Sequence, residues 1–124
     1  MSAVILIVED QPLHAKLFRD ILQLGGFAAV TTASGREAAS VAAGTRPDMI
    51  LLDVLLPDVD GREVIAGLRG AAATRGIGVL AISASPDRDV MDECLAAGAD
   101  GFIAKPVRMA DLLEQVELVL RARR

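Results

Sequence analysis

Five polar residues stand at the ends of short apolar runs, and together their side chains could perform one kind of chemistry. They are Glu9, Asp10, Asp53, Ser83 and Lys105. Carboxylates that are brought together repel one another, so one of them must hold a proton or all of them must share a cation. Oxygen ligands suit a hard ion, and a site with few carboxylates suits Mg²⁺ that keeps several waters. Carboxylates, Mg²⁺, a lysine and a hydroxyl around one point are the groups that phosphoryl transfer needs.

The apolar runs alternate with stretches of helical periodicity along the whole chain. We interpret the runs as strands, because short continuous apolar segments are typical of strands that are buried on both faces. The predicted strands are residues 3–8, 28–32, 49–53, 77–82 and 101–104. The second of these is the least apolar, so we expect it at an edge of the sheet.

Capping and turn residues mark the helices between these strands. Ser34 is predicted to cap a short helix that stops at Gly44. Further along, Ser85 is predicted as the N-cap of the fourth helix, with Pro86 as its first residue and Asp87 as an acid in its first turn. These signals complete five strand-and-helix pairs.

Regular alternation of strands and helices predicts a parallel sheet with helices on both faces. The chain has 124 residues, near the commonest domain size, so we expect one domain over residues 1–124. The expected fold is therefore α/β, a doubly wound five-stranded parallel sheet with five helices. Ligands of such folds bind outside the carboxyl ends of the strands, where the five polar residues are expected to gather. Alternation alone leaves the strand order open.

Composition and charge exclude several other classes of function. The chain has three Phe and no Trp or Tyr, which argues against binding by aromatic stacking. The net charge is −4, and the basic cluster of Arg121, Arg123 and Arg124 is interpreted as cations that complement the dipole of the last helix. We therefore expect no nucleic-acid partner. No apolar run approaches membrane-spanning length, and a cytoplasmic protein without membrane contact is expected.

The ordered set of motifs resembles a known family, the bacterial two-component response-regulator receiver domains, and the resemblance extends along the whole chain. The fold of this family is flavodoxin-like. The matching segments are the acidic pair Glu9-Asp10, the stretch from Asp53 to Gly61, the step Ser83-Ala84 and the pair Lys105-Pro106. One short motif would be weak, but this set in this order is highly specific.

The resemblance implies roles for the residues of the acidic cluster. Asp53 would accept a phosphoryl group from a phosphohistidine on a histidine kinase or a histidine phosphotransfer protein. Asp10, Asp53 and the backbone carbonyl of Leu55 would ligate Mg²⁺, with Glu9 helping through water. Lys105 would pair with a phosphoryl oxygen. The protein would then be a signalling switch and not a metabolic enzyme.

The resemblance also implies how the signal would leave the site. Ser83 would hydrogen-bond another phosphoryl oxygen, and Phe102 would be the aromatic switch that rotates inward. The peptide bond before Pro106 is expected to be cis, which would aim Lys105 at the site. The face built by the fourth helix, the fifth strand and the last helix would then bind a downstream protein target.

Two enzymes or carriers with related chemistry fit the sequence less well. A phosphatase of the haloacid-dehalogenase type needs a second Asp two residues after the nucleophile, where this chain has Leu55. A flavodoxin-like electron carrier needs a hydroxyl- and glycine-rich loop after the first strand, but residues 9–12 would repel a phosphate. The segment 58–61 resembles part of a calcium loop without its later ligands, so we interpret it as a turn. His14 is interpreted as a surface side chain.

Three properties are left open by the sequence. An apolar Leu55 cannot orient an attacking water, which favours a long phosphoryl lifetime but does not set it. The start at Met1 and the arginine-rich end favour a complete single-domain regulator over a piece of a longer protein. The identities of the kinase and the output partner do not follow from any motif.

Overall fold

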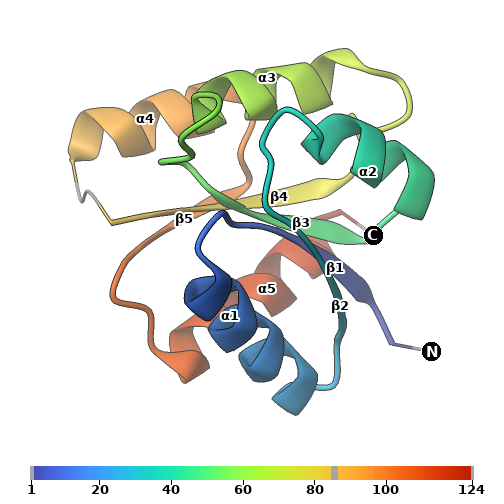
Figure 1. Ribbon diagram of the computed structural model, residues 1–124, viewed down its shortest axis with the longest axis vertical. Coiled ribbons are helices and arrows are strands. Elements are labelled where there is room, and N and C mark those ends of the chain that lie inside the picture. Colours follow the sequence, from blue (N-terminus) through green and yellow to red (C-terminus); the bar gives the residue numbers. More distant parts are fainter. Residues whose placement is uncertain (1, 85–86, 124) are drawn as a thin grey trace.

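Five short aliphatic segments pair into one parallel sheet in the computed structural model, which describes residues 2–84 and 87–123 (Figure 1). The order in the sheet is β2-β1-β3-β4-β5. The strands are β1 (Val4–Val8), β2 (Ala28–Thr32), β3 (Met49–Asp53), β4 (Gly78–Ser83) and β5 (Gly101–Ala104). The predicted doubly wound fold is confirmed, and β2 lies at an edge as expected.

Helices cover both faces of the sheet (Figure 1). They are α1 (Pro12–Leu24), α2 (Ala38–Thr45), α3 (Gly61–Gly70), α4 (Arg88–Ala97) and α5 (Met109–Ala122). Side chains of α1 and α5 pack on one face, and those of α2, α3 and α4 pack on the other. Among the described helices, none combines the length and the apolar character needed to cross a bilayer.

Successive residues of the inner strands point to opposite cores, which explains their continuous apolar sequence. In β1, Leu6 and Val8 face the core under α2, α3 and α4, whereas Ile5 and Ile7 face the core under α1 and α5. All four are fully buried. Burying an aliphatic side chain of this size contributes about 1.5–3 kcal/mol. These cores hold the strand ends, and hence the polar residues that follow them, in fixed positions.

Two predicted helix starts differ from the structure. A turn separates Ser34 from α2, whose N-cap is Glu37; Ser34 Oγ instead accepts a hydrogen bond from the backbone N–H of Glu37 at 3.4 Å. Ser85 and Pro86 lie outside the described residues. The N-cap of α4 is Asp87, whose carboxylate accepts from the backbone N–H of Asp89 at 2.9 Å. Both predictions selected a serine for its capping propensity, but the described helix begins further along the chain.

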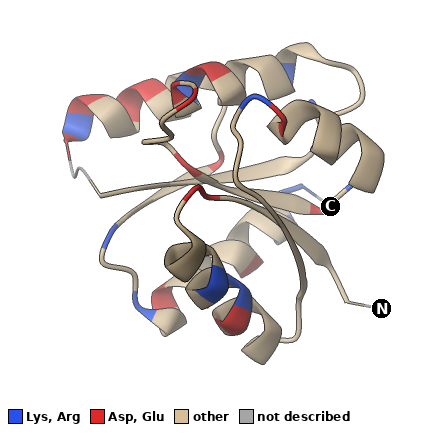
Figure 2. Ribbon diagram, viewed as in Figure 1, with Lys and Arg blue, Asp and Glu red and all other residues tan. Residues whose placement is uncertain are grey.

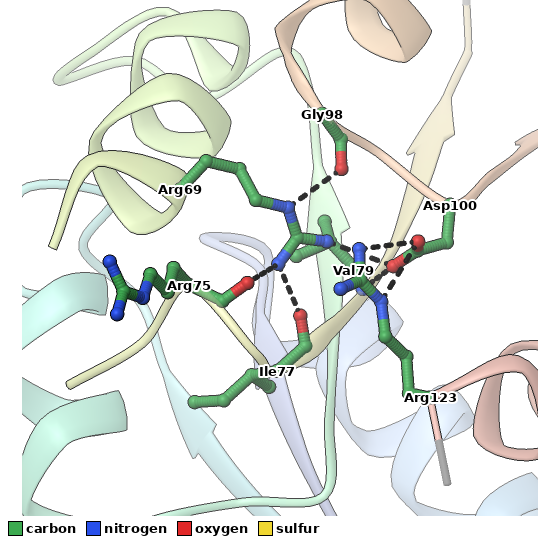
Figure 3. A network of polar contacts seen from close by, with 7 residues as sticks. All are labelled: Arg69, Arg75, Ile77, Val79, Gly98, Asp100 and Arg123. Atoms are coloured by element: carbon green, nitrogen blue, oxygen red, sulfur yellow. Dashed lines mark hydrogen bonds and ion pairs between the residues drawn. The ribbon is translucent and has the colours of Figure 1, made fainter. Parts of the chain in front are cut away.

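An arginine and aspartate network ties together the end of the sheet opposite the polar strand ends (Figure 3). Asp100 accepts from Arg69 Nη2 at 2.9 Å, from Arg123 Nη2 at 2.7 Å and from the backbone N–H of Val79 at 2.8 Å. Arg69 Nε also donates to the carbonyl of Gly98 at 2.9 Å. The network therefore joins α3, the end of α4, β4 and the end of α5. The interpretation of Arg123 as a cation serving the helix dipole was incomplete, since it has a specific partner.

Candidate functional site

Three carboxylates meet where β1 and β3 end side by side. The two strands pair in register, with Val8 opposite Leu52, so Glu9 and Asp10 lie next to Asp53. One carboxylate oxygen from each of the three acids lies within 4.8 Å of the others. Figure 2 shows these acidic segments converging at the strand ends. The predicted gathering of the acids is therefore present in the structure.

The acids of this cluster have unequal environments. Glu9 and Asp53 are buried, whereas Asp10 is half-buried. Burial and the neighbouring Asp53 raise the pKa of Glu9 to about 7. Burial also opposes ionisation of Asp53, but the neighbouring Glu9 carboxyl, the hydrogen bond from the backbone N–H of Leu55 and the charge of Lys105 hold the pKa of Asp53 below its usual range. Of the buried pair, Asp53 is thus the acid whose environment favours the ionised form more.

Lys105 brings a positive charge to the two buried acids. Its backbone N–H donates to the carbonyl of Ser83 at 2.8 Å, and its peptide bond to Pro106 is cis. The ammonium Nζ lies 3.1 Å from Asp53 Oδ2 and 3.1 Å from Glu9 Oε1. Hydrogen bonds and charges of these two acids raise the pKa of Lys105 in spite of its burial. The site therefore presents a carboxylate and a cation to the same small volume.

The donor set at this place fits a hard divalent cation. Glu9 Oε2 is buried and has no hydrogen-bond partner among the described residues, which is costly unless a ligand supplies one. The cluster offers carboxylate oxygens, and no cysteine is among its members. The backbone N–H of Leu55 donates to Asp53 Oδ1 at 2.9 Å, so this carboxylate is held in one orientation. These properties match the oxygen ligands that Mg²⁺ prefers.

The two residues predicted to pass on a shape change lie on neighbouring strands. Ser83 is fully buried at the end of β4, opposite Ala104 of β5. Phe102 is partly buried in β5 and packs against the core under α2, α3 and α4. Because β4 and β5 are paired, a rearrangement of Ser83 would occur one strand away from Phe102, which packs against the core that α4 helps to form.

His14 is a site neighbour that the sequence analysis missed. Its Nδ1 lies 3.2 Å from Glu9 Oε1 and 3.3 Å from Lys105 Nζ, so this side chain, although 42% exposed, has specific contacts that its interpretation as a surface residue did not include. The place of His14 in the sequence was the signal that could have indicated its proximity to the site. His14 stands in the first turn of a helix that begins at the carboxyl end of β1, one turn before the buried Phe18.

The acids of the following loop have structural roles. Asp60 is the N-cap of α3 and accepts from the backbone N–H of Arg62 at 2.9 Å. Asp58 accepts from Ser34 Oγ at 2.8 Å and from the backbone N–H of Arg36 at 3.1 Å. The interpretation of this segment as a turn into the third helix is confirmed, and its carboxylates are used in holding loops.

An apolar cavity opens beside the lysine. Its volume is about 440 Å³, and its lining consists of His14, Leu17, Phe18, Ala84, Lys105, Pro106 and Val107. Two large apolar side chains of α1 are exposed nearby in the sequence, Leu13 at 80% and Leu17 at 51%. A partner that reaches the site along α1 would therefore meet an apolar surface.

Comparisons with known proteins agree over nearly the whole chain. A family model described as the response regulator receiver domain matches residues 5–117. The polar-differentiation response regulator DivK of Brucella ovis is 34% identical over 120 residues, which cover 97% of this chain and 98% of the relative. A putative response regulator from Chloroflexus aurantiacus has a similar structure, with a TM-score of 0.93, 29% identity and coverage of 98% of this chain and 99% of the other. The receiver domain of a Pseudomonas aeruginosa sensor histidine kinase, solved with a magnesium ion in its active-site cleft, gives a TM-score of 0.89, 28% identity and coverage of 98% and 99%.

Proposed function

Because the chain belongs to the family of response regulator receiver domains, which act in two-component phosphorelay signalling, we propose that Asp53 is its phospho-acceptor. The observation that carries this proposal is the contact of 3.1 Å between Asp53 Oδ2 and Lys105 Nζ at a cluster of three carboxylates. The donor would be a phosphohistidine on a histidine kinase or a histidine phosphotransfer protein. The protein would act as a signalling switch and not as a metabolic enzyme.

The proposed transfer is a displacement at phosphorus. A carboxylate oxygen of Asp53 forms the new bond to phosphorus, the bond from phosphorus to the donor imidazole nitrogen breaks, and that nitrogen keeps the electron pair. Both reactants are anionic, so their approach is repulsive until cations neutralise part of the charge. Lys105 supplies one such cation within hydrogen-bond distance of the nucleophile. The buried hydroxyl of Ser83 is proposed to donate to another phosphoryl oxygen.

Mg²⁺ is the proposed cofactor of this step. Asp10, Asp53 and the backbone carbonyl of Leu55 would hold it, with Glu9 contributing through water. When bound, the ion would neutralise charge on the phosphoryl oxygens. The buried, unpartnered Oε2 of Glu9 supports the proposal. The magnesium ion in the similar receiver domain supports it as well.

The proposed output face consists of α4, β5 and α5. Phe102 lies in β5 and contacts the core that α4 helps to form, so a rearrangement at Ser83 has a short path to this face. We propose that a downstream protein binds here, and that neither nucleic acid nor membrane is a partner. Amide exchange with and without beryllofluoride should differ over α4, β5 and α5. A difference confined to α2 would contradict this assignment.

Mass spectrometry after treatment with acetyl phosphate tests the central proposal. We expect one acid- and hydroxylamine-labile phosphoryl group on Asp53, formed only with Mg²⁺. Asp53→Asn should abolish labelling, whereas the matched control Asp92→Asn, an exposed acid of α4, should not change it. A stable adduct on Ser83, or no adduct with acetyl phosphate or any phosphohistidine donor, would overturn the proposed function.

A further inference from the structure

Among the described residues, the ammonium group of Lys105 has three close polar neighbours, and one of them is not a carboxylate. Glu9 Oε1 and Asp53 Oδ2 each lie 3.1 Å from Nζ, and His14 Nδ1 lies 3.3 Å away. An ammonium carries three N–H donors and no acceptor. The three contacts therefore account for the whole hydrogen-bonding capacity of the group.

The contact with Lys105 is a hydrogen bond for one tautomer of the His14 ring. Because an ammonium can only donate, the contact is a hydrogen bond when Nδ1 accepts, which places the ring proton on Nε2. Nδ1 also lies 3.2 Å from Glu9 Oε1, which accepts from the same ammonium. A proton on Nδ1 would instead face the positive charge of Lys105 across 3.3 Å.

Packing on α1 holds this arrangement in place. His14 and Phe18 are one helical turn apart, and their ring centroids are 6.5 Å apart. The Lys105 Nζ lies 5.8 Å from the centre of the Phe18 ring, which is itself buried against the core. A cation at this distance from an aromatic face is attracted to it. One face of α1 thus contacts the ammonium through two side chains.

We propose that His14 is a positioning residue that holds Lys105 at the acceptor site throughout phosphoryl transfer. This inference rests on the proposed function. Asp53 and Glu9 both change partners in that reaction, since one forms the bond to phosphorus and both belong to the proposed cation site. His14 lies outside the three-acid cluster, so we expect its contact with Lys105 to persist when the acids change partners.

Two substitutions of His14 distinguish the contribution of the Nδ1 atom from the contribution of the ring's bulk. His14→Asn places an amide oxygen near the position of Nδ1, whereas His14→Leu keeps comparable bulk without an acceptor. With saturating Mg²⁺ and acetyl phosphate, we expect His14→Leu to slow labelling of Asp53 about tenfold, the effect of losing one hydrogen bond to a charged group. His14→Asn should stay within about twofold of the parent protein.

The same variants in a Lys105→Ala background distinguish positioning from a general structural effect. If His14 acts through Lys105, His14→Leu should have no further effect once the lysine is absent. An equal loss in both backgrounds would overturn the proposal, as would an unchanged rate for His14→Leu. Magnesium affinity should be the same in all His14 variants. Thermal unfolding identifies any variant that fails to fold, and His14→Ala then replaces it.

A measurement without any phosphoryl donor keeps this inference separate from the proposed function. The ammonium signal of Lys105 in nitrogen-15 NMR depends on protection of its hydrogens from exchange with water. We expect His14→Leu to broaden or abolish the signal and His14→Asn to retain it. A signal that is unchanged in His14→Leu would overturn the positioning role. Failure to label the parent protein at Asp53 would overturn the proposed function alone.

Discussion

Lys105 Nζ lies 3.1 Å from Asp53 Oδ2 although the two residues follow strands that are not neighbours: β3 and β5 are separated by β4. The lysine side chain thus reaches across the end of β4 to the buried acids. This contact neutralises a carboxylate that burial would otherwise make unfavourable.

Removing the positive charge of Lys105 should therefore destabilise the metal-free protein. We expect Lys105→Ala to lower the free energy of unfolding by roughly 2–4 kcal/mol at neutral pH, because it leaves buried acids without their cation. Urea denaturation with and without Mg²⁺ measures the loss, and the ion should recover part of it. Lys16→Ala is the matched control, since Lys16 pairs with Asp20 on the exposed side of α1 and should cost less than about 1 kcal/mol. Equal losses for the two variants would contradict the assigned burial of the contact.

Asp10→Asn, in contrast to Lys105→Ala, should stabilise the metal-free protein. Asp10 adds a negative charge to the cluster but has no part in the lysine contacts described above. Its neutralisation should raise the free energy of unfolding by about 1 kcal/mol in chelator. The same substitution should weaken Mg²⁺ binding, measured by titration. An unchanged or lower melting temperature in chelator would count against repulsion in the cluster, and Asp92→Asn provides the baseline.

The arginine and aspartate network should be a strong stabilising element. Arg69→Ala removes hydrogen bonds to Asp100 and to the carbonyls of Gly98 and Ile77, among groups that are largely buried. We expect a loss of roughly 2–4 kcal/mol in urea denaturation. Arg121→Ala, an exposed cation in the last turn of α5, should stay within about 0.5 kcal/mol of the parent protein. A similar effect of both substitutions would show that the network contributes little.

Asp58 should make stability depend on pH in the acid range. Hydrogen bonds from the backbone N–H of Arg36 and the hydroxyl of Ser34 hold the pKa of Asp58 below its usual range. Its stabilising contribution is therefore present above the unfolded pKa, about 3.9, and is lost as pH falls through the lower folded pKa. Asp58→Asn should be less stable than the parent protein at pH ~7 and should approach it in acid. A constant difference in urea midpoint across this range would contradict the assignment.

Leu55 should limit the hydrolysis of a phosphoryl group on Asp53. Its side chain is 54% exposed two residues after the acceptor, and it offers no polar atom to orient water. We expect Leu55→Gln to shorten the lifetime of the adduct severalfold, because an amide can hold an attacking water. Leu55→Ala is the control and should leave the lifetime long. Decay followed by mass spectrometry in chelator-quenched samples decides between them, and equal lifetimes for all three proteins would reject a role of this position.

Much of the fold followed from periodicity, because the inner strands β1, β3 and β4 are mainly continuous apolar runs and most of the helices have an apolar face. Strand order did not follow, since alternation constrains neighbours in the chain and not neighbours in the sheet. The acids and Lys105 were predicted to gather because the carboxyl ends of parallel strands share one edge. The roles assigned to them remain predictions.

The features that the sequence analysis missed depend on packing between distant segments. The contact of His14 with Lys105 joins positions 91 residues apart, which no local pattern reveals. Arg123 likewise reaches Asp100 across the end of the sheet. Local signals also selected the wrong cap for α4, where Asp87 and not Ser85 is the N-cap.

The contact between Lys105 and Glu9 joins residues 96 positions apart, and this spacing has a consequence during synthesis. A chain that is still emerging from the ribosome can contain both buried acids while it lacks β5 and the lysine that follows. A phosphoryl donor that met such a chain would face negative charge without its compensating ammonium. Under the proposed function, an incomplete chain that ends before Lys105 should therefore react with a phosphoryl donor more slowly than the full chain.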